Sequence, residues 1–333
     1  MIKFCQIPAP LQPGDLLQVI APSGALREMS ALEKGVEIWR EHGYQIQICD
    51  GITERWGYLA GQDQHRRYQL KEAWFNPNVK GILCARGGFG STRLLEDWRW
   101  QGGRGAEGQR GRGEMEILPP PQSPIKWLIG FSDVTALLWS LGKEGISGVH
   151  GPMLTTIANE PEWSIERLFD WVEGRSLKPL KGVGWGGGKV SGVLLPANLT
   201  VATHLLGTPL QPEFDGVILA LEDVTEFPYR IDRQLTQWRM SGIFPKVKGI
   251  ALGRFSRCEP PPNIPSLAIE EVLRDRLSDL NIPIISDLPF GHDGPNATLP
   301  VGILAELDAD AGVLSFGDEE LGRVLTCRGE FSS

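Results

Sequence analysis

Two glycine-containing turns lie where a predicted strand runs directly into a predicted helix, and both could take part in chemistry. Residues 130–133 read Gly-Phe-Ser-Asp, and residues 85–90 read Ala-Arg-Gly-Gly-Phe-Gly. A serine in the first turn would stand at the carboxyl edge of a parallel sheet, where α/β folds bind ligands. The first N–H groups of the following helix can stabilise an anion. Spacing alone leaves a second interpretation open, in which Ser132 or Asp133 only caps the helix.

The turn at residues 85–90 offers exposed backbone N–H groups, because glycines allow close approach to the main chain. It could cradle a phosphate, but it lacks the Gly-x-x-x-x-Gly-Lys-Ser/Thr and Gly-x-Gly-x-x-Gly patterns of nucleotide sites. It could equally lend N–H groups to an oxyanion.

An acidic stretch and a loop rich in glycine and proline supply the remaining candidates. Glu222 follows an apolar strand, so its carboxylate could orient a histidine, although an ordinary solvated turn is also compatible with residues 221–229. His292 lies in a loop that its glycines and prolines shape, and histidine is the usual general base near neutral pH. His150, just after a strand, is the one rival, because the other histidines lie on predicted helices.

Composition argues against metals, cofactors and several classes of partner. The five cysteines never form Cys-x-x-Cys, and no histidine pair has metal-ligand spacing, so no metal or cofactor is expected. A net charge of -8 gives no electrostatic reason to bind nucleic acid. Because no apolar run is long enough for a membrane span and the N-terminus does not resemble a signal peptide, a cytoplasmic location is expected.

The elements that must position these residues alternate between strands and helices in the first half. This rhythm indicates a mostly parallel sheet covered on both faces. Strands are predicted at residues 16–21, 45–49, 81–85, 127–129, 192–195, 217–221, 249–252 and 284–286, with a β-hairpin at 303–307 and 313–316.

Glycine-rich segments divide the chain into two predicted domains. Residues 1–180 form an N-terminal α/β domain with a Gly/Arg/Pro-rich insertion at 101–123, which we expect to be a mobile surface loop. Residues 181–189, which include five glycines, are predicted to be a linker. Residues 190–333 form the C-terminal domain, which carries Glu222 and His292.

Taken together, these motifs resemble the LD-carboxypeptidase family of serine peptidases, which contains murein tetrapeptide carboxypeptidases and microcin-immunity peptidases. The resemblance covers nearly the whole chain. It is carried by residues 21–23, 85–90, 130–135, 150–153, 198–199, 207–209, 221–229, 231–233 and 291–292. The length of the 101–123 insertion and the Pro-Ala pair before Asn198 depart from the family pattern.

The resemblance implies a fold and a site. It implies a Rossmann-like N-terminal domain and a smaller C-terminal α/β domain with a barrel-like sheet. Ser132 is then the nucleophile, and Glu222 and His292 complete a catalytic triad. Backbone N–H groups of Asp133 and of Gly88 or Gly87 would form the oxyanion hole.

The implied activity is hydrolysis of the bond before the terminal D-Ala of a murein tetrapeptide, in peptidoglycan recycling. The partner is then a small peptide, without nucleic acid or membrane, and the resemblance also implies a homodimer. Two alternatives stay open: a hydrolase of microcin-type peptide-nucleotide conjugates, and a non-catalytic module that binds nucleotides or muropeptides through the turn at residues 85–90.

Overall fold

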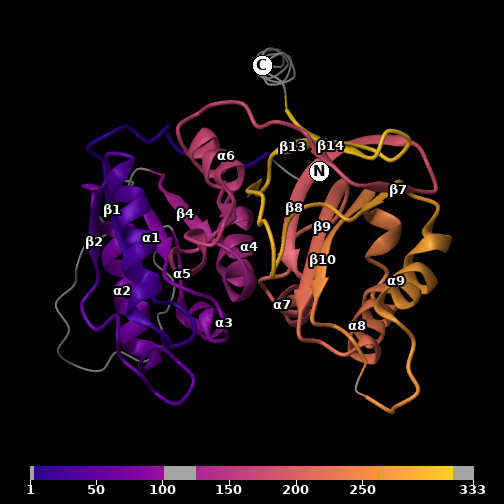
Figure 1. The fold of residues 1–333 in the computed structure, drawn as a ribbon, viewed down its shortest axis with the longest axis horizontal. Helices are drawn as coiled ribbons and strands as arrows, with labels where there is room; N and C mark the ends of the chain where they lie inside the picture. Colours follow the sequence, from indigo (N-terminus) through magenta and orange to yellow (C-terminus); the bar gives the residue numbers. More distant parts are fainter. Residues whose placement is uncertain (1–3, 101–124, 261, 318–333) are drawn as a thin grey trace, which may run out of the picture.

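The computed structural model describes residues 4–100, 125–260 and 262–317. Two sheets lie side by side, one built mainly from the first half of the chain and one from the second, and each carries its own helices (Figure 1). The predicted insertion at residues 101–123 lies outside the described residues. No helix in the described ranges is both long and apolar enough to span a bilayer.

The N-terminal sheet has the strand order β12-β5-β4-β3-β1-β2. All its ladders are parallel except the one between β12 and β5. This order confirms the predicted Rossmann-like, mostly parallel sheet. Its strands are β1 (Leu16–Ile20), β2 (Gln45–Ile48), β3 (Val79–Cys84), β4 (Trp127–Gly130), β5 (Val149–His150) and β12 (Leu299–Pro300).

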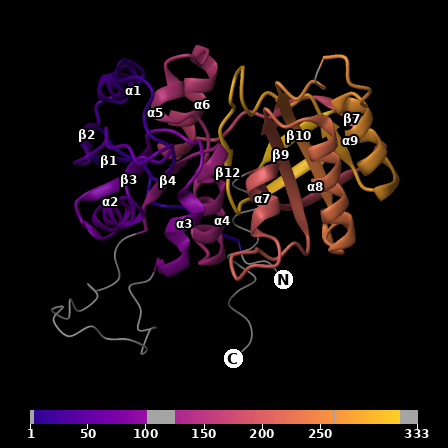
Figure 2. The same ribbon diagram turned by 90° about the horizontal axis from the view of Figure 1, so that it is seen from below.

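Helices cover both faces of this sheet, with α1, α5 and α6 on one side and α2, α3 and α4 on the other (Figure 2). Helix α1 shows why the sequence does this: Leu32, Val36 and Trp39 recur at helical spacing and are buried. The helices are α1 (Met29–Glu41), α2 (Asp63–Phe75), α3 (Ser91–Leu94), α4 (Thr135–Lys143), α5 (Leu154–Ile157) and α6 (Glu162–Val172), with short 3-10 turns η1 (Leu95–Asp97) and η2 (Ser132–Val134).

The C-terminal sheet has a parallel centre, β8-β9-β10-β11, flanked by antiparallel strands. Strands β13 and β14 form the predicted hairpin. The strands are β6 (Leu180–Lys181), β7 (Val183–Trp185), β8 (Lys189–Asn198), β9 (Val217–Val224), β10 (Gly249–Ser256), β11 (Ile284–Ser286), β13 (Leu304–Asp308) and β14 (Val313–Phe316). The helical segments are α7 (Leu199–Leu205), α8 (Pro228–Met240), η3 (Phe244–Lys246), α9 (Ile269–Leu277) and η4 (Ser278–Leu280).

Strands occupy much of residues 181–189, the segment that the sequence predicts as a linker. Strands β6 and β7 occupy opposite edges of the C-terminal sheet, where β6 pairs with β14 and β7 with β11. Two of the glycines allow backbones to approach: a Cβ on Gly184 would lie 1.7 Å from the Ala309 carbonyl oxygen, and one on Gly182 would lie 2.2 Å from that of Ser286. The edge strands are one residue apart in the chain, but no ladder joins them in the described part, so the barrel-like sheet stays a prediction.

The two halves of the chain are joined more closely than a domain boundary near residue 190 implies. Strand β12 comes from the second half but completes the N-terminal sheet. One hydrophobic cluster contains residues of α2 and α4 together with residues of α7 and α8. Within it, Trp139 Nε1 donates to the Pro196 carbonyl oxygen at 2.9 Å. This shared core fixes the carboxyl ends of the two sheets relative to each other.

Candidate active site

Ser132 lies in a sharp turn between β4 and α4. Its φ is 61°, a left-handed conformation that non-glycine residues rarely adopt and that often marks a functional position. Gly130 makes the turn possible, because a Cβ there would lie 2.9 Å from Val134 Cγ1 and 3.1 Å from Cys84 Cβ. The turn therefore lifts Ser132 off the end of the strand and into the pocket.

Asp133 connects the serine turn to the glycine turn at residues 85–90. Its buried carboxylate accepts a hydrogen bond from Ser91 N at 2.8 Å, and its carbonyl oxygen accepts one from Ser91 Oγ at 2.5 Å. Gly87 then lies directly against the serine, since a Cβ on Gly87 would be 3.0 Å from Ser132 Oγ. Gly88 follows with a φ of 111°. The structure thus brings together the backbone segments of Gly87, Gly88 and Asp133 from which we predict oxyanion donors.

Glu222 lies inside strand β9, not after it as the sequence suggested, and its side chain is fully buried. Its Oε2 is 2.7 Å from His292 Nδ1. Its Oε1 accepts a hydrogen bond from Asn198 Nδ2 at 3.1 Å. Asn198 Nδ2 also donates to Asp223 Oδ1 at 3.2 Å, so one amide bridges two neighbouring carboxylates. Both Glu222 oxygens are engaged, which fixes the orientation of this carboxylate.

Packing and hydrogen bonds attach the loop that carries His292 to the C-terminal sheet. Gly291 packs on the strand below it, because a Cβ there would lie 2.9 Å from Glu222 Cβ, and its φ is 104°. The His292 carbonyl oxygen accepts hydrogen bonds from Arg254 Nε at 3.0 Å and from Ser256 Oγ at 2.6 Å. These contacts hold the imidazole above Glu222.

Neighbouring carboxylates favour the protonated form of His292. Burial opposes its charge, but the Glu222 carboxylate, together with Asp223 and Asp293, more than offsets burial and raises the pKa of His292 above its ordinary value. Burial, followed by repulsion from Glu222, raises the pKa of Asp223 to about 6. A carboxylate paired with His292 would therefore stabilise the imidazolium that forms when the histidine accepts a proton.

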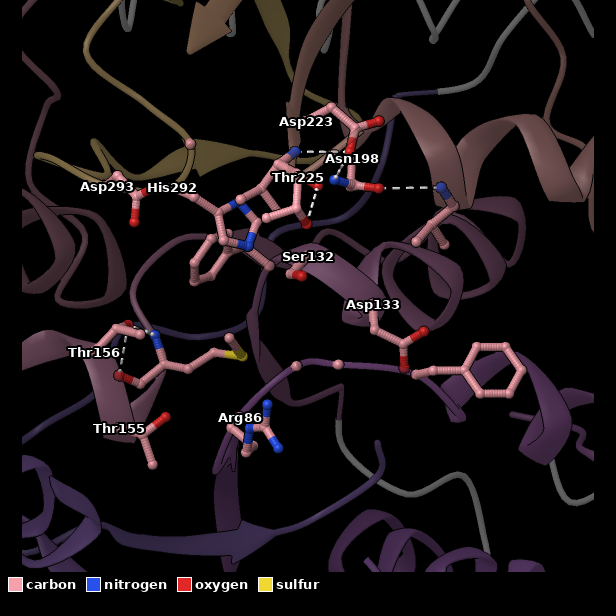
Figure 3. A pocket seen from close by; sticks show the side chains of 18 of the residues that line it. Arg86, Ser132, Asp133, Thr155, Thr156, Asn198, Asp223, Thr225, His292 and Asp293 are labelled. Carbon is pink, nitrogen blue, oxygen red and sulfur yellow. Dashed lines mark hydrogen bonds between the residues drawn. The ribbon is translucent and has the colours of Figure 1, made fainter. Parts of the chain in front are cut away.

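Ser132 and His292 line the same pocket (Figure 3). The Phe131 and His292 rings are 4.8 Å apart between centroids, so the residue before the serine packs against the imidazole. No hydrogen bond joins Ser132 Oγ to His292 in the part of the chain that the structure describes. A serine beside a histidine–carboxylate pair can perform nucleophilic catalysis, and such hydrogen bonds often tighten only when substrate binds.

His150, the rival base, is placed quite differently. It is fully buried between Phe131 and Phe290, with ring centroids 5.9 and 6.4 Å away. Neither of its ring nitrogens has a hydrogen-bond partner among the described residues. Burial lowers the pKa of His150 to about 4. Because it does not line the pocket, it cannot reach a substrate there.

Sequence reasoning missed two supporting residues. Asn198 appeared only as part of a motif, and its contact with Glu222 depends on parallel pairing of β8 with β9, in which Asn198 stands opposite Glu222. Arg254 was not singled out, because nothing local to its sequence indicates that it donates to the loop of His292. An amide or arginine at the end of a central strand is the signal that could have found both.

The pocket has a volume of about 970 Å³ and two walls, one from each half of the chain. The N-terminal wall includes Arg27, Glu28, Arg86, Gly87, Gly88, Phe89, Ser132, Met153 and Glu160. The C-terminal wall includes Asn198, Thr200, Asp223, Thr225, Glu226, Arg257, His292 and Asp293. Across the described ranges, no three side chains of His, Cys, Asp or Glu are grouped as metal ligands would be.

Family models cover most of this architecture. Residues 17–151 match a model described as the LD-carboxypeptidase N-terminal domain, and residues 191–307 match one described as the LD-carboxypeptidase C-terminal domain. The chain is 57% identical over 309 residues to a Synechocystis sp. protein named as a carboxypeptidase, covering 93% of this chain and 96% of that protein. It is 28% identical to the murein tetrapeptide carboxypeptidase of Pseudomonas aeruginosa, covering 88% and 92% of the two chains.

Solved structures agree with these matches. The chain resembles the muramoyltetrapeptide carboxypeptidase from Oxalobacter formigenes with a TM-score of 0.74 and 30% identity, over 91% of this chain and 99% of that one. The microcin C7 self-immunity protein in complex with glutamyl sulfamoyl guanosine gives a TM-score of 0.78 at 22% identity, over 94% and 98% of the two chains, and so shares the fold.

Proposed function

Because the chain belongs to the LD-carboxypeptidase family of serine peptidases, we propose that Ser132, Glu222 and His292 are its catalytic triad. The observation that carries this proposal is the 2.7 Å contact between His292 Nδ1 and Glu222 Oε2, beside a serine held at a φ of 61°. With Nδ1 engaged by this contact, Nε2 is the ring nitrogen that would act as the base. A strained serine next to a correctly oriented base is what covalent catalysis requires.

The chemistry follows from these roles. His292 Nε2 accepts the proton of Ser132 Oγ as the oxygen attacks the scissile carbonyl carbon. Backbone N–H groups of Asp133 and of Gly87 or Gly88 stabilise the oxyanion of the tetrahedral intermediate. The imidazolium then gives its proton to the leaving amine, which departs and leaves an acyl-serine ester. A water molecule, deprotonated by His292, hydrolyses that ester and restores Ser132.

We propose a murein tetrapeptide as the substrate, cleaved before its terminal D-Ala. The relatives named for this activity are 28% and 30% identical to the chain, whereas the microcin immunity protein of Escherichia coli is 26% identical. A peptide-nucleotide conjugate is therefore the second candidate. The predicted cytoplasmic location and homodimer stay predictions.

Release of D-Ala tests the substrate and the nucleophile together. We expect the purified enzyme to release D-Ala from L-Ala-γ-D-Glu-meso-diaminopimelate-D-Ala, with little action when the last residue is L-Ala, because a misplacement of about 1 Å can cost roughly a hundredfold. Mass spectrometry of the products is the measurement. Ser132→Ala should lower the rate by roughly four to six orders of magnitude.

Three results would overturn parts of this assignment. Preferred cleavage between the two D-Ala residues of the pentapeptide would overturn the LD specificity. Near-normal turnover by Ser132→Ala would overturn the nucleophile. Cleavage of a peptide-nucleotide conjugate, with the tetrapeptide left intact, would favour the second candidate.

A further inference from the structure

An arginine without a carboxylate partner lies in the N-terminal wall of the pocket. Arg86 is half-buried and follows β3. Among the described residues it forms no ion pair, and its Nη1 donates to the Ala25 carbonyl oxygen at 2.5 Å. Burial, followed by repulsion from Arg27 and Arg55, lowers the pKa of Arg86. A partly desolvated cation that the protein itself leaves unneutralised favours an anionic ligand.

The place of Arg86 in the fold supports the same conclusion. Strands β1 and β3 are neighbours, but the helix after β1 covers one face of the sheet and the helix after β3 covers the other (Figure 2). In open α/β sheets, ligands bind in the crevice at such a switch point. The Arg86 guanidinium spans this crevice, because it bonds to Ala25 after β1 and its Nη2 lies 3.7 Å from where a Cβ on Gly88 would be.

Both walls of the pocket carry charges of both signs, but the arginine of the C-terminal wall, Arg257, is paired with Asp293 at 2.7 Å. Figure 3 shows Arg86 on one side of Ser132 and the acidic side chains of Asp223 and Asp293 on the other. Of the two arginines on the N-terminal wall, Arg27 is exposed and Arg86 is half-buried, so Arg86 is the more desolvated cation that a substrate carboxylate could meet.

We propose that Arg86 binds the free carboxylate of the amino acid that leaves, and thereby makes the enzyme an exopeptidase. This inference rests on the proposed function. Arg86 and Ser132 line the same pocket, and Gly87, the residue after Arg86, lies against Ser132. In a carboxypeptidase substrate, the carboxylate nearest to the scissile carbonyl is that of the terminal residue, separated from this carbonyl only by the amide nitrogen and one carbon.

The test measures binding to enzyme that cannot turn over. Ser132→Ala protein, with and without Arg86→Met, is titrated with the tetrapeptide as the free acid and as the C-terminal carboxamide. We expect Arg86→Met to weaken binding of the acid by roughly 10- to 100-fold, the range of a hydrogen bond to a charged group, and to change binding of the amide by less than about threefold. Arg86→Lys should keep part of the preference for the acid. Thermal melting establishes that each variant is folded.

Arg55→Met is the matched control. Arg55 Nη2 donates to the Leu26 carbonyl oxygen at 2.9 Å, so it holds the same loop as Arg86, but it does not line the pocket. We expect the ratio of the affinities for the acid and the amide to be the same in Arg55→Met as in the protein that keeps both arginines.

Three outcomes would overturn the inference. Equal weakening of acid and amide by Arg86→Met would make Arg86 only a support for the loop. A loss confined to peptides with diaminopimelate, compared with lysine, before D-Ala would assign Arg86 to that side-chain carboxylate instead. If neither peptide binds to Ser132→Ala, the proposed substrate is wrong as well. In the first two outcomes peptide still binds to Ser132→Ala, so a failure of the substrate can be told apart from a failure of the role of Arg86.

Discussion

The two walls of the pocket prepare the same reaction by different physical means. The N-terminal wall depends on backbone geometry, because Ser132 is strained at a φ of 61° and Gly87 leaves room for its hydroxyl group. The C-terminal wall depends on buried side-chain hydrogen bonds, in which Asn198 holds Glu222 and Glu222 holds His292. We therefore expect the N-terminal wall to be sensitive to substitutions that add atoms, and the C-terminal wall to substitutions that remove charge.

This difference has a structural origin. The nucleophile must present an oxygen and nearby N–H groups, which a strand-to-helix turn supplies directly. The base must be oriented and must be stabilised when it becomes charged, which requires a carboxylate away from water. Placing Glu222 inside β9, instead of in a solvated turn, provides that environment.

Apart from loss of the nucleophile itself, removing charge from the C-terminal wall should have the largest effect. Glu222→Gln keeps the shape of the side chain but no longer stabilises the imidazolium, so we expect kcat to fall about ten-thousandfold, as when a triad carboxylate becomes an amide. The acid limb of the kcat/KM profile should also move to lower pH. Glu222 raises the pKa of His292 against burial, so without it burial dominates and the base stays neutral to lower pH.

Glu226→Gln is the control for this variant. Glu226 also lines the pocket, but it pairs with Arg230 at 3.3 Å instead of with His292. Its substitution should shift the acid limb far less. An unchanged acid limb in Glu222→Gln, at any level of activity, would show that Glu222 does not set the titration of the base.

Sequence reasoning predicted the parts of this site that depend on local pattern. The serine turn and the glycine before His292 are visible because tight turns restrict residue type. The apolar runs of β1 and β3 likewise predicted the parallel sheet.

The rest depended on pairing between distant segments. Asn198 meets Glu222 only because β8 and β9 are in one particular register. Residues 181–185 looked flexible because glycine is common in linkers, whereas here the missing side chains allow Gly184 to approach Ala309. The crossing of β12 to the N-terminal sheet has no local signal at all.

Adding atoms to the N-terminal wall should have the next largest effect. A Cβ on Gly87 would lie 3.0 Å from both Cβ and Oγ of Ser132, and 3.4 Å from Met153 Cε. Gly87→Ala should therefore displace the serine or the adjacent N–H groups and lower kcat by roughly a hundred- to a thousandfold, the cost of losing one oxyanion donor. Thermal stability should change little, because the φ of Gly87 is not positive.

Gly142→Ala is the matched control, since a Cβ there meets Val301 Cγ1 at an ordinary 3.6 Å and the position is helical. It should keep normal kinetics. Full activity in Gly87→Ala would mean that the glycine turn is not close to the reacting atoms, and would weaken the contrast between the walls.

The smallest expected effect concerns His150, which lies under the site and should affect stability instead of catalysis. Its pKa is lowered to about 4 by burial, from an ordinary value of 6.5. The unfolded chain therefore binds a proton on this group between these two pH values while the native protein does not, so native stability falls as the pH drops through this window. His150→Leu removes that loss and also removes two buried nitrogens that have no hydrogen-bond partner among the described residues.

A pH of 5 lies 1.5 units below the ordinary pKa of 6.5, and each unit corresponds to about 1.36 kcal/mol. The unfolding free energy of His150→Leu minus that of the native chain should therefore be about 2 kcal/mol larger at pH 5 than at pH 7.5. Urea denaturation of both proteins at the two pH values gives this double difference, in which the titration of Asp223 and of other shared groups cancels. The acid limb of activity should stay with His292. A stability difference that is independent of pH would mean that His150 is protonated or hydrogen-bonded in the native protein, and a displaced acid limb would return it to the list of candidate bases.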